Sequence, residues 1–371
     1  MRTNELIDVS KKVIGEKMDL DYLSRFYGTL IFRQFKDKIS ESEIETIRNA
    51  LFANGIYSQL QVTSSEYLLR VIAEYSTFKK ENTIINLLLF FATILTTTLT
   101  GASLIWNNPF SSFENYLTGL PYAFALILFF SAHEMGHYYF ARKHHIHATW
   151  PYFIPFYFEG LFHIGTFGAF IKIKSPIPNK KALLDVGIAG PIAGFIISLL
   201  LLYIGFSQLP NANGVRSYVE QMHPWEETGT GALTLGSSIL FEFIRYIMGG
   251  THLPMYEVYH FPFIFAGWVG LLATAINLIP VGQLDGGHIS YALFGKDSRY
   301  ISYASFLGVV ILTIFHIGWL IWVLLLLFLI RFKHPPTIDD NIELDDTRKK
   351  LAWLSYVIFL ISFPPIPVYF P

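Results

Sequence analysis

Long, mostly apolar stretches dominate the chain from Ile84 onward. The first of them, Ile84–Gly101, contains no ionisable side chain, and Lys79 and Lys80 stand shortly before it. An α-helix needs about 20 apolar residues to cross the hydrocarbon core of a bilayer, and most of these stretches approach that length. The pattern therefore predicts about six to eight transmembrane helices rather than the buried helices of a soluble protein. The later stretches are Leu120–Phe140, Ala182–Phe206, Phe261–Pro280, Tyr300–Phe315, Gly318–Ile330 and Leu351–Val368.

The first 80 residues show a different pattern, in which charged and apolar residues are mixed at short intervals. Ser40–Ala53 starts with Ser and early Glu residues and continues with apolar residues at helical spacing, which predicts a helix. Gly28–Phe35 and Tyr67–Ala73 are rich in β-branched and aromatic residues, which is typical of strands. Because the first long apolar stretch begins only at Ile84, we expect no signal peptide.

Lys and Arg residues are distributed unevenly among the loops between the apolar stretches. If the N-terminus is cytoplasmic and the chain crosses seven times, thirteen of these residues fall in inside loops. Only Arg216 and Arg245 fall in outside loops, and the positive-inside rule favours this orientation. Gly231–Met248 is apolar but carries Glu242 and Arg245, so we expect an amphipathic helix at the outer surface.

These patterns together define the expected fold class and domain organisation. Residues 1–80 are expected to form a small soluble α+β domain in the cytoplasm. Residues 81–371 are expected to form a transmembrane domain with its core at about 81–335. The fold class is thus a mostly α, polytopic membrane protein with an α+β N-terminal domain.

The composition supports a membrane location and excludes several classes of function. Of 371 residues, 52% are hydrophobic and only 15% are charged, and the mean hydropathy is +0.42. The formal net charge of −1 argues against a broad surface for nucleic acid. Because the chain has no cysteine, disulfides and thiolate chemistry are excluded, and any metal must be held by His, Asp or Glu.

The segment His133-Glu134-Met135-Gly136-His137 lies in the second apolar stretch and matches the pattern H-E-x-x-H. Residues four apart share one face of a helix, so His133 and His137 can bind one metal ion. Glu134 stands beside the first His, where it can take a proton from water held at the metal. Ionisable side chains within a membrane helix are costly, which favours a functional site over a polar patch between helices.

A third protein ligand is expected, because catalytic zinc sites usually have three. Asp285 is the best candidate, since it follows an apolar stretch broken by Pro280 and Gly282 and precedes two glycines. The spacing is equally consistent with a simple Asp-Gly-Gly turn at the membrane edge. Asp285 reaches the depth of His133 only if Gly231–Met248 does not cross the membrane.

Three features together resemble the site-2 protease family of intramembrane zinc metalloproteases. The first is H-E-x-x-H within a membrane helix, and the second is Asn-x-x-Pro-x-x-x-Leu-Asp-Gly-Gly at Asn277–Gly287. The third is the Gly-Thr-Phe-Gly-Ala stretch at Gly165–Ala169 between them. The resemblance covers about residues 80–335.

The resemblance implies a zinc-dependent endopeptidase that cleaves peptide bonds within or near transmembrane segments of other membrane proteins. It implies a single zinc ion per chain, with Glu134 as the general base and Asn277 positioning or stabilising the reacting carbonyl. The implied zinc ligands are His133, His137 and Asp285. Implied substrates are single-pass membrane proteins, such as anti-sigma-factor-like regulators; the oligomeric state is left open.

Other features resemble one branch of that family. Ser207–Thr230 is too short to hold a PDZ domain. The soluble N-terminal domain and the ending His334-Pro335-Pro336 resemble the branch that includes bacterial and plastid members. We therefore expect a multi-pass protein of a bacterial inner membrane or a plastid membrane, with the N-terminus and the active site toward the cytoplasmic side.

Trp150–Lys174 is dense in aromatic residues and prolines, and its second half alternates as strands do. We interpret it as a β-hairpin that dips into the membrane beside the metal. Its edge could add an unwound substrate as a further strand, and a lipid-facing interfacial anchor is the alternative. The residues predicted to bind substrate in this way are Gly165, Thr166, Phe167 and Gly168.

Two other functions fit parts of the pattern. A membrane metal transporter also uses buried His and Asp, but Glu beside His is a hydrolytic arrangement, and no second ladder of metal ligands is visible. A catalytically inactive scaffold need not retain these residues. Among the remaining candidates, a position of His288 beside the ligands is the less favoured of two interpretations, and the acidic run Asp339–Asp346 is interpreted as a solvated loop.

Overall fold

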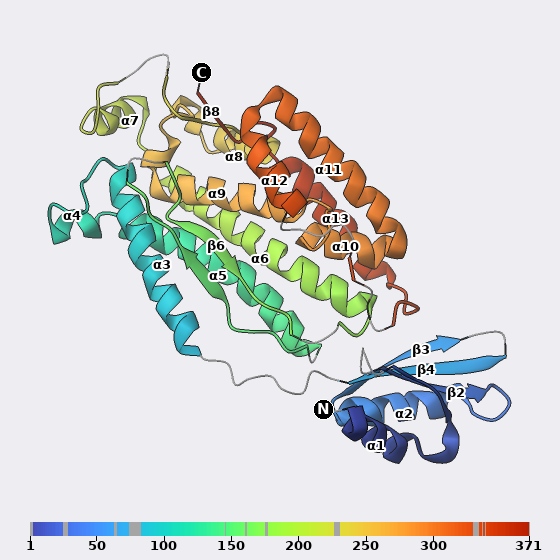
Figure 1. The fold of residues 1–371 in the computed structure, drawn as a ribbon. Coiled ribbons are helices and arrows are strands. Elements are labelled where there is room, and N and C mark those ends of the chain that lie inside the picture. Colours follow the sequence, from blue (N-terminus) through green and yellow to red (C-terminus); the bar gives the residue numbers. More distant parts are fainter. Residues whose placement is uncertain are drawn as a thin grey trace.

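The computed structural model describes residues 3–24, 29–62, 65–73, 83–144, 146–159, 162–174, 177–225, 231–328, 334–335, 337 and 339–370. Helices predominate in these ranges, and the strands form three small sheets. Figure 1 shows an N-terminal α+β unit next to a bundle of long helices.

The N-terminal unit is an antiparallel four-stranded sheet, in the order β1-β2-β4-β3, combined with two helices. Apolar side chains of the sheet and the helices, including Leu30, Leu51 and Leu69, are fully buried in one core. Burial of these side chains is the main source of stability for so small a unit. Its elements are α1 (Thr3–Ile14), β1 (Asp19–Ser24), β2 (Thr29–Phe35), α2 (Glu41–Ala53), β3 (Ile56–Val62) and β4 (Glu66–Ala73).

The predicted helix of this unit is α2. It begins with a capping box, in which Glu43 N donates to Ser40 Oγ at 3.3 Å and Ser40 N donates to the Glu43 carboxylate at 3.1 Å. The two predicted strands are β2 and β4, which pair with each other along their whole length. β1 and β3 were not predicted; Asp19–Ser24 carries two Asp residues, a residue type that is uncommon in strands.

Four helical segments of the described chain are long and apolar enough to cross a membrane, by length and composition. They are α3 (Thr83–Leu104), α4 with α5 (Phe113–Leu117, Leu120–Lys143), α6 (Lys180–Ser207) and α10 with α11 (Asp285–Phe294, Ser298–Phe315). These correspond to four of the predicted spans. The other three predicted spans correspond to the shorter helices α9 (Pro262–Asn277), α12 (Leu320–Phe328) and α13 (Asp346–Ser362).

The centre of the bundle is formed by α5, α6 and α9, which pack against one another. Leu126, Leu202 and Phe265, one from each helix, are fully buried in their shared core. On the other side of α5 lie α3 and an antiparallel hairpin of β5 (Tyr152–Pro155) and β6 (Thr166–Phe170). The predicted hairpin is thus confirmed, next to the helix that carries the H-E-x-x-H motif.

The predicted amphipathic segment Gly231–Met248 forms a short strand, β7 (Thr234–Leu235), and the nine-residue helix α8 (Ile239–Ile247). A helix of nine residues is roughly 14 Å long, too short to cross a bilayer. The short length of α8 agrees with the expectation that this segment does not cross, which stays a prediction. β7 pairs with β8 (Val368–Tyr369) near the C-terminus, which fastens α8 to the end of the chain.

The prediction of a solvated loop at Asp339–Asp346 is wrong. Asp339 is buried, and its carboxylate lies 3.2 Å from Arg48 Nη2 of α2. Asp340 accepts a hydrogen bond from Tyr291 Oη at 2.7 Å, and Asp345 caps the first turn of α13. The acidic run was misread because its cationic and hydroxyl partners lie far away in the sequence.

Candidate active site

α5 carries three ionisable side chains on the side that faces the bundle. His133, Glu134 and His137 are 3%, 4% and 7% exposed, so none of them faces lipid or open solvent. The two His residues are one helical turn apart and share a face. Such buried polar groups are costly unless they bind a partner, which favours a functional role.

Asp285 is the first residue of α10 and follows a tight turn at Leu278–Leu284. Within the turn, Val281 N donates to Ile279 O at 2.7 Å. The turn folds back onto the start of α10 so closely that a Cβ at Gly286 would lie 2.1 Å from Leu278 O. The Asp-Gly-Gly segment therefore forms the first turn of helix α10, directly after this tight turn, and the fold-back brings the Asp285 carboxylate to α5.

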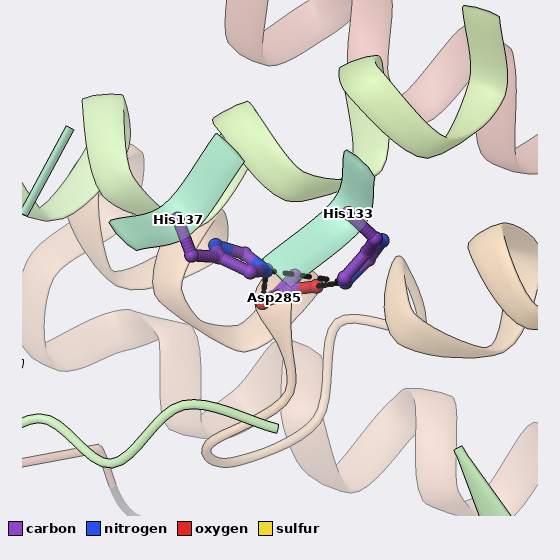
Figure 2. Close-up of side chains that lie close together, drawn as sticks. All are labelled: His133, His137 and Asp285. Atoms are coloured by element: carbon purple, nitrogen blue, oxygen red, sulfur yellow. Dashed lines mark hydrogen bonds and ion pairs between the residues drawn. The ribbon is translucent and has the colours of Figure 1, made fainter. Parts of the chain in front are cut away.

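The three predicted ligands converge on one point, as Figure 2 shows. His133 Nε2 and His137 Nε2 are 3.1 Å apart. Each of these atoms lies 3.4 Å from an oxygen of Asp285. Ligands at 2.0–2.1 Å from a tetrahedral metal ion are about 3.3 Å from one another, so the donor set and its spacing fit zinc.

The neighbouring helix α6 orients the second imidazole. His137 Nδ1 lies 2.7 Å from Val186 O, and a carbonyl can only accept, so Nδ1 carries the hydrogen. The lone pair of Nε2 then points toward His133 and Asp285. Close approach of α6 depends on Gly190, where a Cβ would lie 2.1 Å from His137 Nε2.

Beside the three ligands lies a cavity of about 210 Å³. Glu134 and Asn277 line it, and Asn277 Nδ2 is 3.4 Å from His133 Nε2. The cavity thus brings together the predicted base, the predicted amide donor and the ligands. Its remaining lining residues are Ala169, Phe170, Ile171, Ile173, Val186, Gln283, Leu284 and His288.

The predicted substrate-binding residues Gly165–Gly168 belong to the hairpin but do not line this cavity. Gly165 packs against α3, where Thr96 Oγ1 donates to its carbonyl at 2.8 Å. Phe167 is 68% exposed, and Gly168 lies against the ring of Phe130. The residues that follow, Ala169–Ile171, are the part of the hairpin that reaches the ligands.

His288 lies one helical turn beyond Asp285 and also lines the cavity. Its Nδ1 is 2.6 Å from Nε2 of His334, which stacks on the ring of Tyr291. His288 is therefore next to the ligands, which was the less favoured alternative from the sequence, and it connects α10 to the segment that precedes α13.

A second group of potential metal ligands was missed by the sequence analysis. His223, Glu257 and His260 come together at the start of α9, the end opposite Asn277. No motif joins them, because 37 residues separate His223 from His260. Only the packing of two distant segments brings them into contact.

Comparison with known proteins gives a family match over the same region. Residues 121–316 match the family model described as Peptidase family M50, and this interval contains all the candidate ligands on α5 and α10. Probable zinc metalloprotease EGY1, chloroplastic, of Oryza sativa subsp. japonica is 31% identical over 258 residues, 68% of this chain and 41% of that protein. Probable zinc metalloprotease EGY2, chloroplastic, of Arabidopsis thaliana is 31% identical over 265 residues, 70% of this chain and 44% of that protein.

The chain spans less than half the length of these curated relatives. No solved structure matches it. The family match covers more than half of the 371 residues and includes the H-E-x-x-H helix, the hairpin and the Asp-Gly-Gly turn. The chain therefore belongs to peptidase family M50, the site-2 protease family.

Proposed function

We propose that this chain is an intramembrane zinc metalloprotease that hydrolyses peptide bonds within or near transmembrane segments of other membrane proteins. One observation carries the proposal: two imidazoles and one carboxylate lie 3.1–3.4 Å apart, with a buried glutamate beside them in a cavity. The candidate spanning helices and the family match support it. The relatives named as zinc metalloproteases make zinc the metal of choice, with one ion at this site.

His133, His137 and Asp285 would hold the ion. When bound, zinc supplies Lewis acidity, which activates a water molecule near neutral pH and polarises a carbonyl group. Glu134 takes a proton from the attacking water and delivers it to the leaving amine. The Asn277 amide donates a hydrogen bond to the carbonyl oxygen, where negative charge develops.

The hairpin offers a means of presenting the substrate. A transmembrane helix hides its amides in internal hydrogen bonds, so a segment must unwind before hydrolysis. Lys172 N donates to Thr149 Oγ1 and Lys172 O accepts from Thr149 N, so the neighbouring Ile171 directs its backbone groups the other way, where its N–H donates to the Glu134 carboxylate. We propose that this outer edge, at Ala169–Ile171, pairs with the unwound segment beside the ligands.

The substrates we propose are single-pass membrane proteins, including membrane-held regulators, so that cleavage releases a soluble part. The orientation we propose places the N-terminal unit and the active site on the cytoplasmic side of a bacterial inner membrane, or on the equivalent side of a plastid membrane. The excess of Lys and Arg in the inside loops supports this orientation. The relatives named as chloroplastic support the plastid alternative.

The test is cleavage of a panel of single-pass membrane proteins in liposomes, with new N-termini identified by mass spectrometry. We expect Glu134→Gln to lower the rate by roughly 10²–10⁴-fold while zinc content is unchanged, because only the proton acceptor is lost. Glu114→Gln, on the exposed helix α4, is the matched control and should cleave as the wild type does.

Equal cleavage by the wild type and Glu134→Gln would refute a glutamate-based hydrolysis. Zinc flux into protein-containing liposomes without any cleavage would instead favour a transporter. Stable capture of membrane proteins with neither cleavage nor flux would favour an inactive scaffold.

A further inference from the structure

The cluster His223, Glu257 and His260 lies away from the active site, at the start of α9. His223 follows α7 (Ala212–Val219). Glu257 precedes the short turn Val258–His260 that leads into α9, and His260 is the last residue of that turn. Glu257 and His260 are 1% and 0% exposed, so this is an interior group and not a surface patch.

The geometry of this cluster closely matches that of the active site. The two imidazole Nε2 atoms are 3.1 Å apart, the same separation as between His133 and His137. Glu257 Oε2 lies 3.4 Å from His223 Nε2 and 3.3 Å from His260 Nε2. These three separations again fit the edges of a tetrahedral site, about 3.3 Å long.

Both imidazoles are oriented by backbone carbonyls. His260 Nδ1 lies 2.5 Å from Leu104 O, and His223 Nδ1 lies 3.0 Å from Pro224 O. Because a carbonyl only accepts, each Nδ1 carries the hydrogen and each neutral ring turns the lone pair of its Nε2 toward the other ring. Two lone pairs and a carboxylate then face one another, an arrangement that a cation stabilises.

One oxygen of the Glu257 carboxylate lacks a hydrogen-bond partner. Glu257 Oε2 is buried and has no hydrogen-bond partner among the described residues. A buried carboxylate oxygen without a hydrogen bond or a bound cation is costly. This unsatisfied oxygen points to a ligand, independently of the spacing of the two imidazoles.

The cluster is also built from strained local structure. Trp106 is the one non-glycine residue of the described chain with a positive φ, of 58°. Its indole packs against the ring of His223, with the ring centres 5.2 Å apart. The end of α3, through Trp106 and Leu104, therefore supports both imidazoles.

We propose that His223, Glu257 and His260 form a second metal site, which binds zinc and has a structural role. Two imidazoles with one carboxylate favour zinc over magnesium or calcium, which take oxygen ligands. The ion would tie the end of α3 and the segment after α7 to the start of α9. It lies about 25 Å along α9 from Asn277, too far for the two sites to pass an ion directly between them.

The proposal is tested by the zinc content of the full-length protein, purified in detergent and measured by elemental analysis. The wild type should hold two zinc ions per chain, not the single ion implied by the resemblance. Glu257→Gln, which keeps the shape of the side chain, and His223→Ala, on a partly exposed loop, should each hold one. Asp285→Ala should hold one, and Asp285→Ala combined with Glu257→Gln should hold none.

His252→Ala is the matched control, because His252 is partly exposed, lies outside the cluster and has its Nε2 2.7 Å from Pro210 O. It should keep two ions. Added zinc should also raise the melting temperature of Asp285→Ala, and this rise should disappear when His223→Ala is combined with it.

Wild type with one ion that Glu257→Gln retains would overturn the second site and identify the cluster as a hydrogen-bonded His-Glu-His group. A melting temperature of Asp285→Ala that does not respond to zinc would overturn it as well. The cleavage test with Glu134→Gln is independent of both results, so failure of the second site and failure of the protease proposal are distinguishable.

Discussion

His137 is held between a backbone carbonyl and a glycine of the same neighbouring helix. Val186 O fixes its Nδ1 at 2.7 Å, and Gly190 leaves room for its Nε2 edge. A side chain at position 190 would occupy the space in which the ligand points at the metal. The G-x-x-x-G spacing of Gly190 and Gly194, which favours close helix packing in many membrane proteins, here also accommodates a ligand.

Gly190→Ala tests this role. A Cβ at this position would lie 2.1 Å from His137 Nε2, so the imidazole must turn away from His133 and Asp285. We expect zinc affinity at the active site to fall roughly 10–100-fold, the range for changes that disturb ligand orientation. Competition with a chelator of known affinity measures this zinc affinity. The measurement uses the Glu257→Gln background, so that only the active site is counted. Gly308→Ala, at an open position of α11, is the control.

Asn277→Ala tests the proposed amide donor. Asn277 Nδ2 is 3.4 Å from His133 Nε2 and lines the cavity, without being one of the three ligands. Loss of a hydrogen bond that strengthens in the transition state should lower kcat by roughly 10²–10³-fold. KM and zinc content should change little. A variant that loses zinc instead would assign Asn277 to holding His133 in place.

The active-site ligands on α5 were predictable because helical periodicity places His133 and His137 on one face. Asp285 was not determined by its local pattern, which is also that of a turn; in the structure the tight turn precedes it and Asp285 begins α10. The roles of Gly190 and Val186 could not be predicted, since they depend on which face of α6 meets α5. The His223 cluster was not predicted for the same reason, because it depends on how distant segments pack.

At the scale of elements, the hairpin is where the sequence and the structure differ most in detail. The hairpin itself was predicted from aromatic, proline and alternating residues, and β5 and β6 confirm it. The residues that reach the cavity are Ala169–Ile171, whereas the prediction named Gly165–Gly168. Alternation identifies a strand, but the point where it passes the ligands depends on the packing of its tip against α3.

Ile171→Pro tests the proposed edge pairing. Proline removes the N–H that faces the Glu134 carboxylate and points away from Thr149, so the hairpin keeps its bonds to Thr149 while Glu134, or a paired substrate, loses one donor. We expect cleavage to fall at least tenfold and zinc content to stay at the wild-type value, for a hydrogen bond of roughly 1.5 kcal/mol. Ile171→Ala, which keeps the N–H, is the matched control. Equal cleavage by both variants would exclude backbone pairing at this position.

Long apolar stretches predicted four of the helical segments well, because length and hydropathy are local properties. The short helices α9, α12 and α13 are harder to assign as spans from length, and α9 contains only 16 residues. The acidic run at Asp339–Asp346 was misread for a different reason. Asp339 pairs with Arg48 of α2 and Asp340 accepts a hydrogen bond from Tyr291 of α10, and no local pattern reveals these two partners.

At the scale of the whole molecule, the segment that contains Asp339 connects the N-terminal unit to the bundle. Asp339 N donates to Pro178 O just before α6, and the Asp339 carboxylate lies 3.2 Å from Arg48 Nη2. Asn341 Nδ2 also donates to Leu60 O of β3 at 3.3 Å. The N-terminal unit thus contacts a segment that is itself anchored at the start of α6, the helix that orients His137.

Arg48→Ala should release the N-terminal unit from this contact. The side chains of Arg48 and Asp339 are 17% and 7% exposed, so water screens their ion pair only in part. Loss of this ion pair should weaken the docking of the N-terminal unit by roughly 1–3 kcal/mol, which shifts the docking equilibrium about 5–150-fold toward the undocked state. Because the chain has no cysteine, nitroxide labels at Asp37→Cys and Lys349→Cys report the separation directly, as a narrow distance distribution that broadens in Arg48→Ala.

Lys17→Ala, which removes an exposed pair within the N-terminal unit, should leave the distribution narrow. A narrow distribution in Arg48→Ala would show that the ion pair does not hold the two parts together, and a broad one in the wild type would show that they do not dock in solution.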